Sequence, residues 1–419
     1  MVTERVEDDH IEDLEEDQFI DPNDVLGEVE MDGDLPMDED EEDGAAGEHP
    51  PDEEIVWEDN SMQHFPNHNG SVFAISTHPA APIAASGGED DLGYIWDITT
   101  GDELVKLTGH TDSVTSTAFS ADGELVATGG MDGKVRVWRR VGKDSYKSWE
   151  FLTELTGPDE VMWLKWHPKG TVLLAGSNDT TVWLWQLPSG NTMQVFAGHM
   201  GPVACGDFTP DGKRIITADA EGTLIFWDPR SPTPVFKLSP SNGRFALDGI
   251  TSLAVNPAST LAVVGGANGG VRVISLSKGE IVGALAGHQE GESVEAVQFV
   301  ELAAPAPLSG AAPSAGGVVV TGATDGKACV WDLSTMRLRA TLEHGDAVTS
   351  LHRLPPPKAH LIVSASADKI LRTWDARTGT LVREHKGHSA PVLGAALGMG
   401  GDVVVSAGDE GVCLVFPTE

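Results

Sequence analysis

Histidine, hydroxyl and carboxylate side chains occur along the sequence at a spacing that could support nucleophilic chemistry. His110 is followed by Thr128 and then by Asp132. A hydroxyl becomes a nucleophile when a histidine takes its proton and a carboxylate orients that histidine. The set therefore raises the hypothesis of a hydrolase.

The same set returns in other parts of the chain, and this recurrence argues against catalysis. Six of the 14 histidines lie at corresponding positions: His68, His110, His199, His288, His344 and His388. Three copies keep the hydroxyl and the carboxylate in order: His68 with Ser86 and Asp90, His110 with Thr128 and Asp132, and His344 with Ser364 and Asp368. An enzyme needs such a set once, whereas a buried polar network that rigidifies a fold can repeat. We therefore expect that the protein is not an enzyme.

No other motif predicts a cofactor or a metal. The sequence has no GxxxxGK phosphate loop, no GxGxxG after a strand and no HxxEH spacing. The three cysteines, Cys205, Cys329 and Cys413, are odd in number and widely spaced, which argues against a disulfide framework or a zinc site. We expect neither a cofactor nor a bound metal.

Charge is distributed unevenly along the 419 residues, whose net charge is −38. Residues 1–60 hold 27 of the 65 acids and one base, Arg5, so the remaining residues hold 38 acids and 26 bases. Both parts repel phosphate, which disfavours direct binding of nucleic acid or of an anionic membrane. Basic proteins are the expected partners, and we expect a monomer.

Residues 1–60 are predicted to form a disordered acidic arm ahead of a folded domain at 61–419. The arm contains the run MDEDEEDG at 37–44, and it has too few apolar residues to offset the entropy of folding. Its apolar residues 55–57 either pack on the domain or form a short partner-binding motif. The chain shows no secretory signal and no run of ~20 apolar residues, so we expect the cytoplasm, with the nucleus as a second location.

A repeat of ~40–45 residues begins after residue 60, with Gly-His near its start and Trp-Asp at its end. One copy runs from Gly109-His110 through SVTSTAFS, ADGELVATGG and MDGKVRVW to Trp138. Other copies start at His199, His288 and His344 and close with FWD, VWD and TWD. The chain thus resembles the WD-repeat β-propeller family over residues 61–416, and this resemblance implies an all-β propeller.

The number of blades follows from the aromatic residue that ends each third strand. It is found at Trp96, Trp138, Trp185, Trp227, Ile274, Trp331, Trp374 and Phe416, where Ile274 and Phe416 replace the usual tryptophan. One long interval is explained by the Ala/Pro-rich segment at 301–316, which we interpret as a loop insertion. We predict eight blades.

The last blade lacks sequence for its outer strand, because Phe416 lies three residues from the end of the chain. Residues 61–65 (SMQHF) have the offset of an outer strand and can pair with residues 412–416. This closure would hide an open sheet edge. The alternative is a seven-bladed ring with one decayed repeat outside it.

Resemblance to the family also implies a role for the repeated histidines. In WD repeats this histidine bonds the Ser/Thr and the Asp on neighbouring strands, and the tryptophan completes a buried polar chain. The residues that this implies here are His110, Thr128, Asp132 and Trp138 in one blade and His344, Ser364, Asp368 and Trp374 in another. Blades three and five lack parts of the pattern, through either local decay with apolar compensation or specialisation for binding.

Propellers of this family bind partners at the rim around the narrow end of the channel. The family's rim positions and the acids in the same loops give ten candidates: Phe73, Glu89, Asp112, Met131, Asp159, Glu160, Met162, Asp248, Glu295 and Asp409. No Lys or Arg occupies these positions, so the surface suits an Arg/Lys-rich peptide. The alternative is that acids are simply common in this chain.

Within the family, the acidic arm, the HNGSVFAISTHP opening and the EVMWLKWHP segment resemble a subfamily of eukaryotic ribosome-assembly chaperones. That resemblance implies an escort that holds the basic N-terminal segment of a large-subunit ribosomal protein and delivers it to the pre-60S particle. Two alternatives remain open. WDPR at 227–230 and WDAR at 374–377 would suit a substrate receptor of a cullin-type ubiquitin ligase, and a generic scaffold would have a more apolar face.

Overall fold

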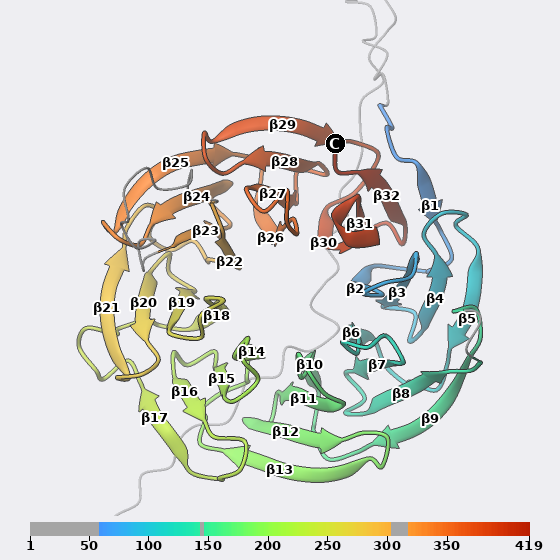
Figure 1. The fold of residues 1–419 in the computed structure, drawn as a ribbon, viewed down its shortest axis with the longest axis horizontal. Coiled ribbons are helices and arrows are strands. Elements are labelled where there is room, and N and C mark those ends of the chain that lie inside the picture. Colours follow the sequence, from blue (N-terminus) through green and yellow to red (C-terminus); the bar gives the residue numbers. More distant parts are fainter. Residues whose placement is uncertain (1–57, 143–145, 303–316) are drawn as a thin grey trace, which may run out of the picture. The chain divides into compact units, whose positions relative to one another are not determined.

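The described part of the chain comprises residues 58–142, 146–302 and 317–419, and it forms eight four-stranded antiparallel sheets around a central channel. These sheets, seen in a computed structural model, are the blades of a propeller (Figure 1). Each blade is a meander whose first strand borders the channel and whose fourth strand lies on the outside (Figure 1). The predicted all-β, eight-bladed fold is confirmed, and no helix of these residues is long and apolar enough to cross a membrane.

The first four blades follow one another in sequence order. Blade 1 is β2 (Val72–Thr77), β3 (Ile83–Gly88), β4 (Gly93–Asp97) and β5 (Glu103–Leu107), and blade 2 is β6 (Val114–Phe119), β7 (Leu125–Gly130), β8 (Val135–Arg140) and β9 (Trp149–Leu155). Blade 3 is β10 (Val161–Trp166), β11 (Val172–Ser177), β12 (Thr181–Gln186) and β13 (Asn191–Ala197), and blade 4 is β14 (Cys205–Phe208), β15 (Ile215–Ala218), β16 (Leu224–Trp227) and β17 (Pro234–Leu238).

The remaining blades complete the circle. Blade 5 is β18 (Ile250–Val255), β19 (Leu261–Gly266), β20 (Val271–Ser275) and β21 (Glu280–Leu285), and blade 6 is β22 (Ala296–Val300), β23 (Val318–Gly322), β24 (Lys327–Asp332) and β25 (Arg337–Glu343). Blade 7 is β26 (Val348–Arg353), β27 (Leu361–Ser366), β28 (Leu371–Asp375) and β29 (Thr380–His385). Blade 8 is β30 (Val392–Gly398), β31 (Val403–Gly408), β32 (Cys413–Pro417) and β1 (Gln63–Phe65), with the 3-10 turn η1 (Met399–Gly401) after β30.

Apolar side chains are buried in the layers between adjacent blades. The second strand of most blades is buried over nearly its whole length, as in β3, β7 and β27, because both faces of each sheet are covered by neighbouring blades. All eight anchor residues that end the third strands are at most 6 % exposed. The alternative of a seven-bladed ring is therefore wrong, since Ile274 and Phe416 stand in complete blades.

Blade 8 is built from both ends of the described chain. Gln63, His64 and Phe65 of β1 pair with Val415, Leu414 and Cys413 of β32, which confirms the predicted closure with a shorter strand than expected. Phe65 is fully buried, and its ring stacks on Trp96 of blade 1 with centroids 4.9 Å apart. The closing strand thus joins blade 8 to blade 1. The predicted acidic arm lies outside the described residues up to residue 57, as do residues 303–316 of the predicted insertion.

Blade 5 replaces the polar chain by apolar packing. Ile274 stands at the tryptophan position, and Phe245 and Leu247 of the preceding loop are fully buried in the same cluster. The loop is held by Arg272, whose guanidinium donates a hydrogen bond to the carbonyl oxygen of Ala246 at 3.2 Å. Local loss of the histidine is compensated here by hydrophobic contacts.

Blade 3 uses tryptophans for the same purpose. Trp183 stacks on Trp185 with ring centroids 5.8 Å apart. Gly157, at the position of the usual Gly-His glycine, has φ +136° and lies against this ring, so a Cβ there would come within 2.3 Å of Trp183. A glycine is required at 157 because its φ is positive and because a Cβ would overlap this ring.

Removing the closing strand is expected to open the ring and to destabilise the domain. Phe65→Ala should lower the free energy of unfolding by about 3–5 kcal/mol, because it empties a fully buried aromatic site between two blades. Deletion of residues 1–66 should lower the melting temperature sharply, whereas deletion of residues 1–52 should leave it nearly unchanged. Calorimetry of the three variants measures this, and equal melting of the two truncations would contradict the role of β1.

Candidate functional site

The repeated histidines form buried hydrogen-bonded sets in five blades. His110 Nδ1 lies 3.0 Å from Asp132 Oδ1, and its Nε2 lies 2.7 Å from Thr128 Oγ1. Corresponding contacts link His68 to Asp90 and Ser86, His199 to Asp219 and Thr217, His288 to Asp325 and Thr321, and His388 to Glu410 and Ser406.

The environment of His110 favours a neutral ring. Burial lowers its pKa, and the hydrogen bond and negative charge of Asp132 offset this only in part. A neutral ring that donates from Nδ1 to the carboxylate can accept at Nε2 from the threonine hydroxyl. The Thr128 side chain is fully buried, so no substrate can reach its hydroxyl, and the set serves structure.

Two members of the expected polar chains are placed differently. His344 Nε2 lies 2.7 Å from Ser364 Oγ, but its Nδ1 faces the carbonyl oxygen of Leu342 and not Asp368. Asp368 accepts instead from the backbone N–H of Gly345 at 2.7 Å and from Arg372 at 2.6 Å. The expected His344–Asp368 bond is therefore wrong. Arg372 occupies the Asp368 carboxylate, and His344 turns its Nδ1 to the backbone instead.

The tryptophans complete the chain in only part of the blades. Trp374 Nε1 donates to Ser364 Oγ at 2.9 Å, and the same bond is made in blades 4 and 6 by Trp227 and Trp331. Trp138 makes no such bond with Thr128 and packs edge-on against a phenylalanine of β9. The expectation for Trp138 as a hydrogen-bonded member is thus wrong, although the residue remains buried.

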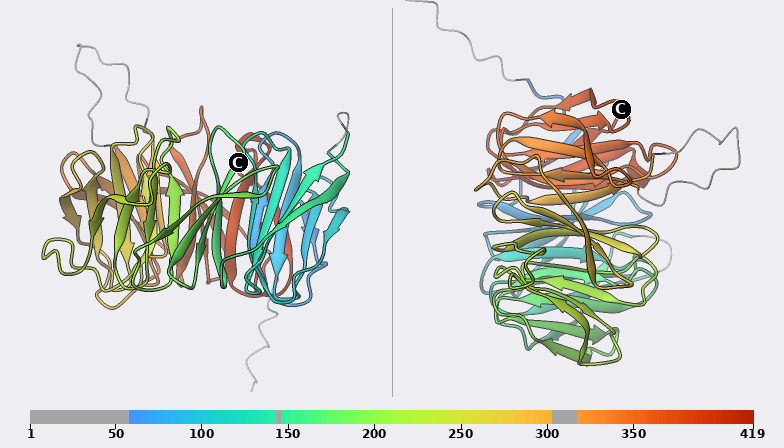
Figure 2. Two further views of the ribbon diagram at one scale, coloured as in Figure 1. Left: turned by 90° about the horizontal axis from the view of Figure 1, so that it is seen from below. Right: turned by 90° about the vertical axis from the view of Figure 1, so that its left-hand side faces the viewer.

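Loops at one end of the ring bring the ten rim candidates together. In a four-stranded meander the turn between the second and third strands and the link to the next blade lie at the same end (Figure 2). Phe73 and Met162 belong to inner strands, Glu89, Met131 and Asp409 to turns between second and third strands, and Asp112, Asp159, Glu160, Asp248 and Glu295 to links between blades. Nine are exposed and Glu160 is half-buried. We refer to this end as the acidic face.

Several carboxylates of the acidic face are held by hydrogen bonds from neighbouring groups. Asp409 accepts from the Ser71 hydroxyl at 2.6 Å, and Glu89 accepts from the Ser71 backbone N–H at 3.2 Å. Asp248 accepts from the amide of Asn268 at 2.8 Å. These charges are fixed in position before any partner arrives.

Three other carboxylates, those of Asp159, Glu160 and Glu295, have no hydrogen bond or ion pair to the described residues. They can therefore receive a cationic group without first breaking an internal bond. Phe73, Met131 and Met162 add exposed apolar surface on blades 1–3, with 39–43 % of each residue exposed. The acidic face combines both kinds of contact that a basic peptide needs.

Sequence reasoning missed several residues of this end. Met200, in the link between blades 3 and 4, is 72 % exposed, and Glu221 is an exposed carboxylate in the turn of blade 4. Met200 follows His199 directly, so its position after Gly-His could have identified it. Arg244 and Lys369 place two bases in loops of the same end, and neither lies at a predicted rim position.

Comparison with known proteins shows where this fold belongs. The repeat described as "WD domain, G-beta repeat" matches residues 59–97, 101–139, 149–186, 190–228 and 336–375. Human angio-associated migratory cell protein is 32 % identical over 372 residues, covering 85 % of this chain and 80 % of the relative. The chain belongs to this WD-repeat family.

Other members of the family act in ribosome assembly. The ribosome assembly protein Sqt1 of Saccharomyces cerevisiae is 28 % identical over 396 residues, covering 87 % of this chain and 88 % of the relative. The structure of Chaetomium thermophilum Sqt1 bound to the N-terminus of ribosomal protein L10 matches with a TM-score of 0.78 and 30 % identity. That match covers 86 % of this WD-repeat chain and all of the solved one.

Breaking a polar chain is expected to lower the stability of the fold and to affect no catalytic activity. Asp132→Ala should lower the free energy of unfolding by about 1–3 kcal/mol, because it leaves buried donors without an acceptor. Asp112→Ala, an exposed change in the preceding link, should be nearly neutral and is the matched control. Urea unfolding measures both, and hydrolytic turnover that disappears with His110→Ala would overturn the structural role.

Stability is expected to rise with pH between about 4 and 6.5. Burial, aided by the charge of Arg372, lowers the pKa of His344 to about 4, and burial lowers the pKa of His385 to about 4 as well. Since unfolded histidine titrates near 6.5, the unfolded chain binds more protons in this range and acid favours it. Urea unfolding across this pH range should show a smaller slope for His344→Gln, and an unchanged slope would refute the assignment.

Proposed function

We propose that this protein is an escort that binds the basic N-terminal segment of a large-subunit ribosomal protein on its acidic face. The observation that carries the proposal is that one face holds the unpaired carboxylates Asp159, Glu160 and Glu295 together with exposed Phe73 and Met162. Support comes from the Chaetomium thermophilum relative, which is bound to the N-terminus of ribosomal protein L10.

Charge explains why such a client needs an escort. A ribosomal protein is basic and is attracted to any RNA that it meets, so an acidic surface both shields it and speeds its capture. Apolar side chains at Met131 and Met162 would pack against the aliphatic parts of the client's lysines and arginines. The same acidic charge disfavours direct contact with nucleic acid or with an anionic membrane.

Delivery of the client to the pre-60S particle, in the cytoplasm and the nucleus, is the finer part of the proposal. The escort would act as a monomer without a cofactor or bound metal and without catalysing a reaction. The role of the yeast relative as a ribosome assembly protein supports this part of the proposal.

The ligase-receptor alternative depends on the two Trp-Asp-x-Arg sequences. Arg377 is folded back on Asp375, with Nη2 2.6 Å from Oδ2, so this arginine is engaged within its own turn. Asp228 of the other sequence pairs with Arg214 at 3.0 Å. Both arginines of these sequences, Arg230 and Arg377, remain exposed, so it is the L10-bound relative that favours the escort over the ligase receptor and the generic scaffold.

Charge reversal on the acidic face is expected to abolish client capture. The double variant Glu160→Lys/Asp409→Lys should weaken binding of the L10 N-terminal peptide by roughly 10- to 100-fold at 0.1 M salt, because two attractive contacts become repulsive. Binding to the wild type should itself weaken towards 1 M salt, where the Debye length falls from ~10 Å to ~3 Å. Fluorescence anisotropy with a labelled peptide measures both effects.

The matched control carries the same change in charge at exposed positions away from the acidic face. Asp102→Lys/Glu280→Lys alters exposed residues at the start of the outer strands of blades 1 and 5, where neither side chain bonds another described residue. This variant should bind the peptide nearly as the wild type does. Equal affinities of the wild type and the Glu160/Asp409 variant would refute the proposed function.

A further inference from the structure

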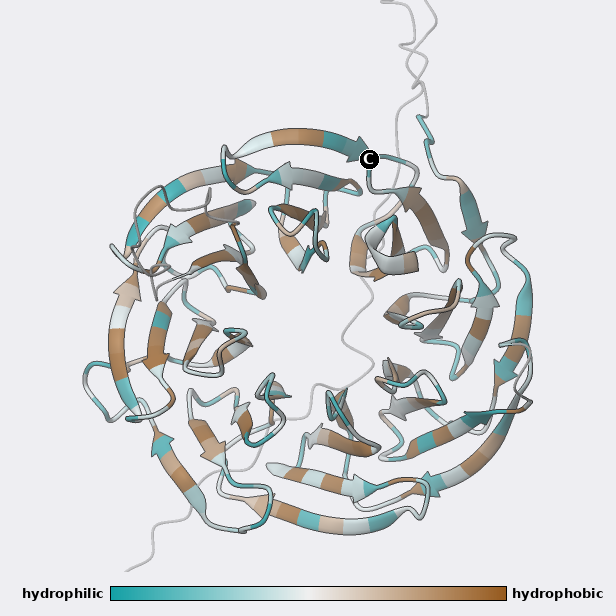
Figure 3. Cartoon of the chain, viewed as in Figure 1, coloured by the Kyte–Doolittle hydropathy of each residue, from teal (hydrophilic) through white to brown (hydrophobic). Residues whose placement is uncertain are grey.

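Exposed apolar side chains are scarce on the acidic face. Hydrophobic residues are concentrated in the strands, and many of the connecting loops are hydrophilic (Figure 3). Among the described residues, four large apolar side chains are nevertheless exposed at this end: Phe73, Met131, Met162 and Met200. Three of the four are methionines, in blade 2, in blade 3 and in the link from blade 3 to blade 4. The apolar part of the acidic face is therefore mainly thioether.

The main chain holds each of these methionines at the rim. The backbone N–H of Met131 donates to the carbonyl oxygen of Ser113 at 2.9 Å, and that of Met200 donates to the Asp219 carboxylate at 2.9 Å. Met162 stands at a register shift between β10 and β11, where it has no strand partner although both of its neighbours are paired. Each thioether is thus presented from a fixed backbone, in the place where the side chains of a client would meet it.

Thioethers react with peroxides without first losing a proton. The sulfur lone pair attacks one oxygen of hydrogen peroxide, the O–O bond breaks, and the products are a sulfoxide and water. The sulfur loses two electrons and the peroxide gains them, so no further reactant is needed. Hydrogen peroxide is uncharged, so the negative charge of the acidic face does not repel it, whereas an anionic oxidant such as hypochlorite is repelled.

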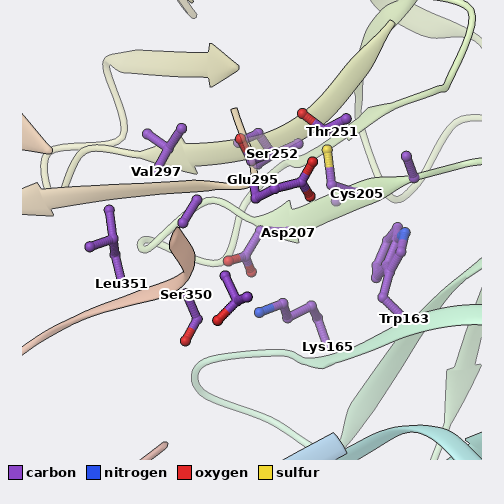
Figure 4. A pocket seen from close by; sticks show the side chains of 15 residues that line it. Trp163, Lys165, Cys205, Asp207, Thr251, Ser252, Glu295, Val297, Ser350 and Leu351 are labelled. Atoms are coloured by element: carbon purple, nitrogen blue, oxygen red, sulfur yellow. The ribbon is translucent and has the colours of Figure 1, made fainter. Parts of the chain in front are cut away.

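The three cysteines compete poorly for the oxidant. A thiol reacts as its thiolate, and burial raises the pKa of all three thiols. Cys329 and Cys413 are buried, and the pKa of Cys329 is raised to about 12. Cys205 is half-buried in the wall of a channel cavity of about 250 Å³ (Figure 4), and the charge of Lys165 offsets the effect of burial on its pKa only in part. The methionines of the acidic face are therefore the more accessible targets.

Oxidation of these methionines would not disturb the core. Of the seven methionines among the described residues, one, Met336, is half-buried and packs against a buried cluster. The other six are exposed, three on the acidic face and three elsewhere: Met62, Met193 and Met399. Oxidation is therefore expected to change the surface and to leave the fold intact.

A sulfoxide changes what the acidic face offers to a client. The thioether is apolar and polarisable, whereas the sulfoxide carries a polar, hydrated oxygen. That oxygen could accept a hydrogen bond from a lysine or an arginine, but the carboxylates of the acidic face already supply such acceptors. Burying the hydrated group against an aliphatic side chain also costs free energy. The net effect is the loss of apolar contacts, which are scarce on this face.

We propose that Met131, Met162 and Met200 form an oxidation-sensitive site, at which peroxide converts the thioethers to sulfoxides and thereby weakens the binding of the client. The proposal rests on the proposed function, because it concerns the same face. Methionine sulfoxide reductases, one for each epimer of the sulfoxide, would return the thioethers and restore binding. Capture of the client would thus depend on the oxidation state of three side chains that the fold itself does not need.

Two matched triple variants test the site. The face variant is Met131→Leu/Met162→Leu/Met200→Leu, and the control variant is Met62→Leu/Met193→Leu/Met399→Leu. The control methionines are 40–52 % exposed and those of the face are 41–72 % exposed, so peroxide can reach both sets. Leucine has nearly the volume of methionine and carries no sulfur to oxidise. Each protein is treated with hydrogen peroxide, the peroxide is removed, and labelled L10 N-terminal peptide is then added, so that only the protein is oxidised.

Oxidation should raise the Kd of the wild type for the peptide roughly tenfold, a free-energy difference of about 1.4 kcal/mol. The control variant should weaken as much, whereas the face variant should change little. Each protein is compared with its own untreated sample, so that any effect of the substitutions themselves cancels. Both reductases together should restore the affinity of the oxidised wild type, whose melting temperature should stay near that of the untreated protein. Peptide mass mapping should find an added oxygen at each of the three face methionines.

The outcomes separate this inference from the proposed function. If the wild type carries the three sulfoxides and binds as well as before or more tightly, or if the face variant weakens as much as the wild type, the oxidation-sensitive site is wrong although the acidic face still binds the peptide. If peroxide oxidises the control methionines and spares those of the face, the site is also wrong. If the untreated wild type does not bind the peptide at all, the proposed function fails and control of binding by oxidation fails with it.

Discussion

The pairing of β1 with β32 is the contact on which the rest of the structure depends. A propeller has no hub, so each blade is stabilised only by its two neighbours and the ring is stable only when it is closed. Here the closing strand pairs three residues, Gln63 to Phe65, and Phe65 reaches across to stack on Trp96. Closure removes the open edge of β32 and fixes the diameter of the channel, and it thereby sets the distances between the loops of the acidic face.

Buried polar chains connect this framework to the loops that would meet a partner. The carboxylate that orients each histidine also accepts a backbone N–H from the link between blades: Asp132 accepts from Thr111 at 3.1 Å, and Asp219 accepts from Met200 at 2.9 Å. The same network that rigidifies the interior therefore positions exposed side chains such as Met200. In blade 3 the Ser177 hydroxyl accepts from the backbone N–H of Asp159 at 3.0 Å, and in blade 5 Arg272 donates to the carbonyl oxygen of Ala246, so both links are held without the histidine.

Much of the fold could be predicted from sequence because its signals are local. The Trp-Asp ends of the third strands lie at regular intervals, so the anchors identified eight blades even where Ile274 replaced the aromatic. The His344–Asp368 bond could not be predicted in this way. Arg372 competes for the Asp368 carboxylate, and this competition is a tertiary effect that residue spacing does not reveal.

The candidate site was predictable as a set of positions but not as a set of interactions. Sequence spacing places Glu89, Glu160 and Asp409 in loops at one end, yet it does not tell which carboxylates are already bonded. Lys165 was missed because a lysine in an apolar strand carries no periodic signal that it faces a channel shared by eight blades.

Differences among the carboxylates have a consequence for binding. Asp409 and Glu89 are held in place through Ser71, so binding a cation costs little further ordering of these two side chains. The cation must, however, share carboxylate oxygens that already accept hydrogen bonds. Glu160 and Glu295 are free, so they offer full acceptor capacity at the cost of ordering the side chain on binding. A face with both kinds combines a fixed electrostatic field, which accelerates encounter at long range, with adaptable groups that form short-range bonds.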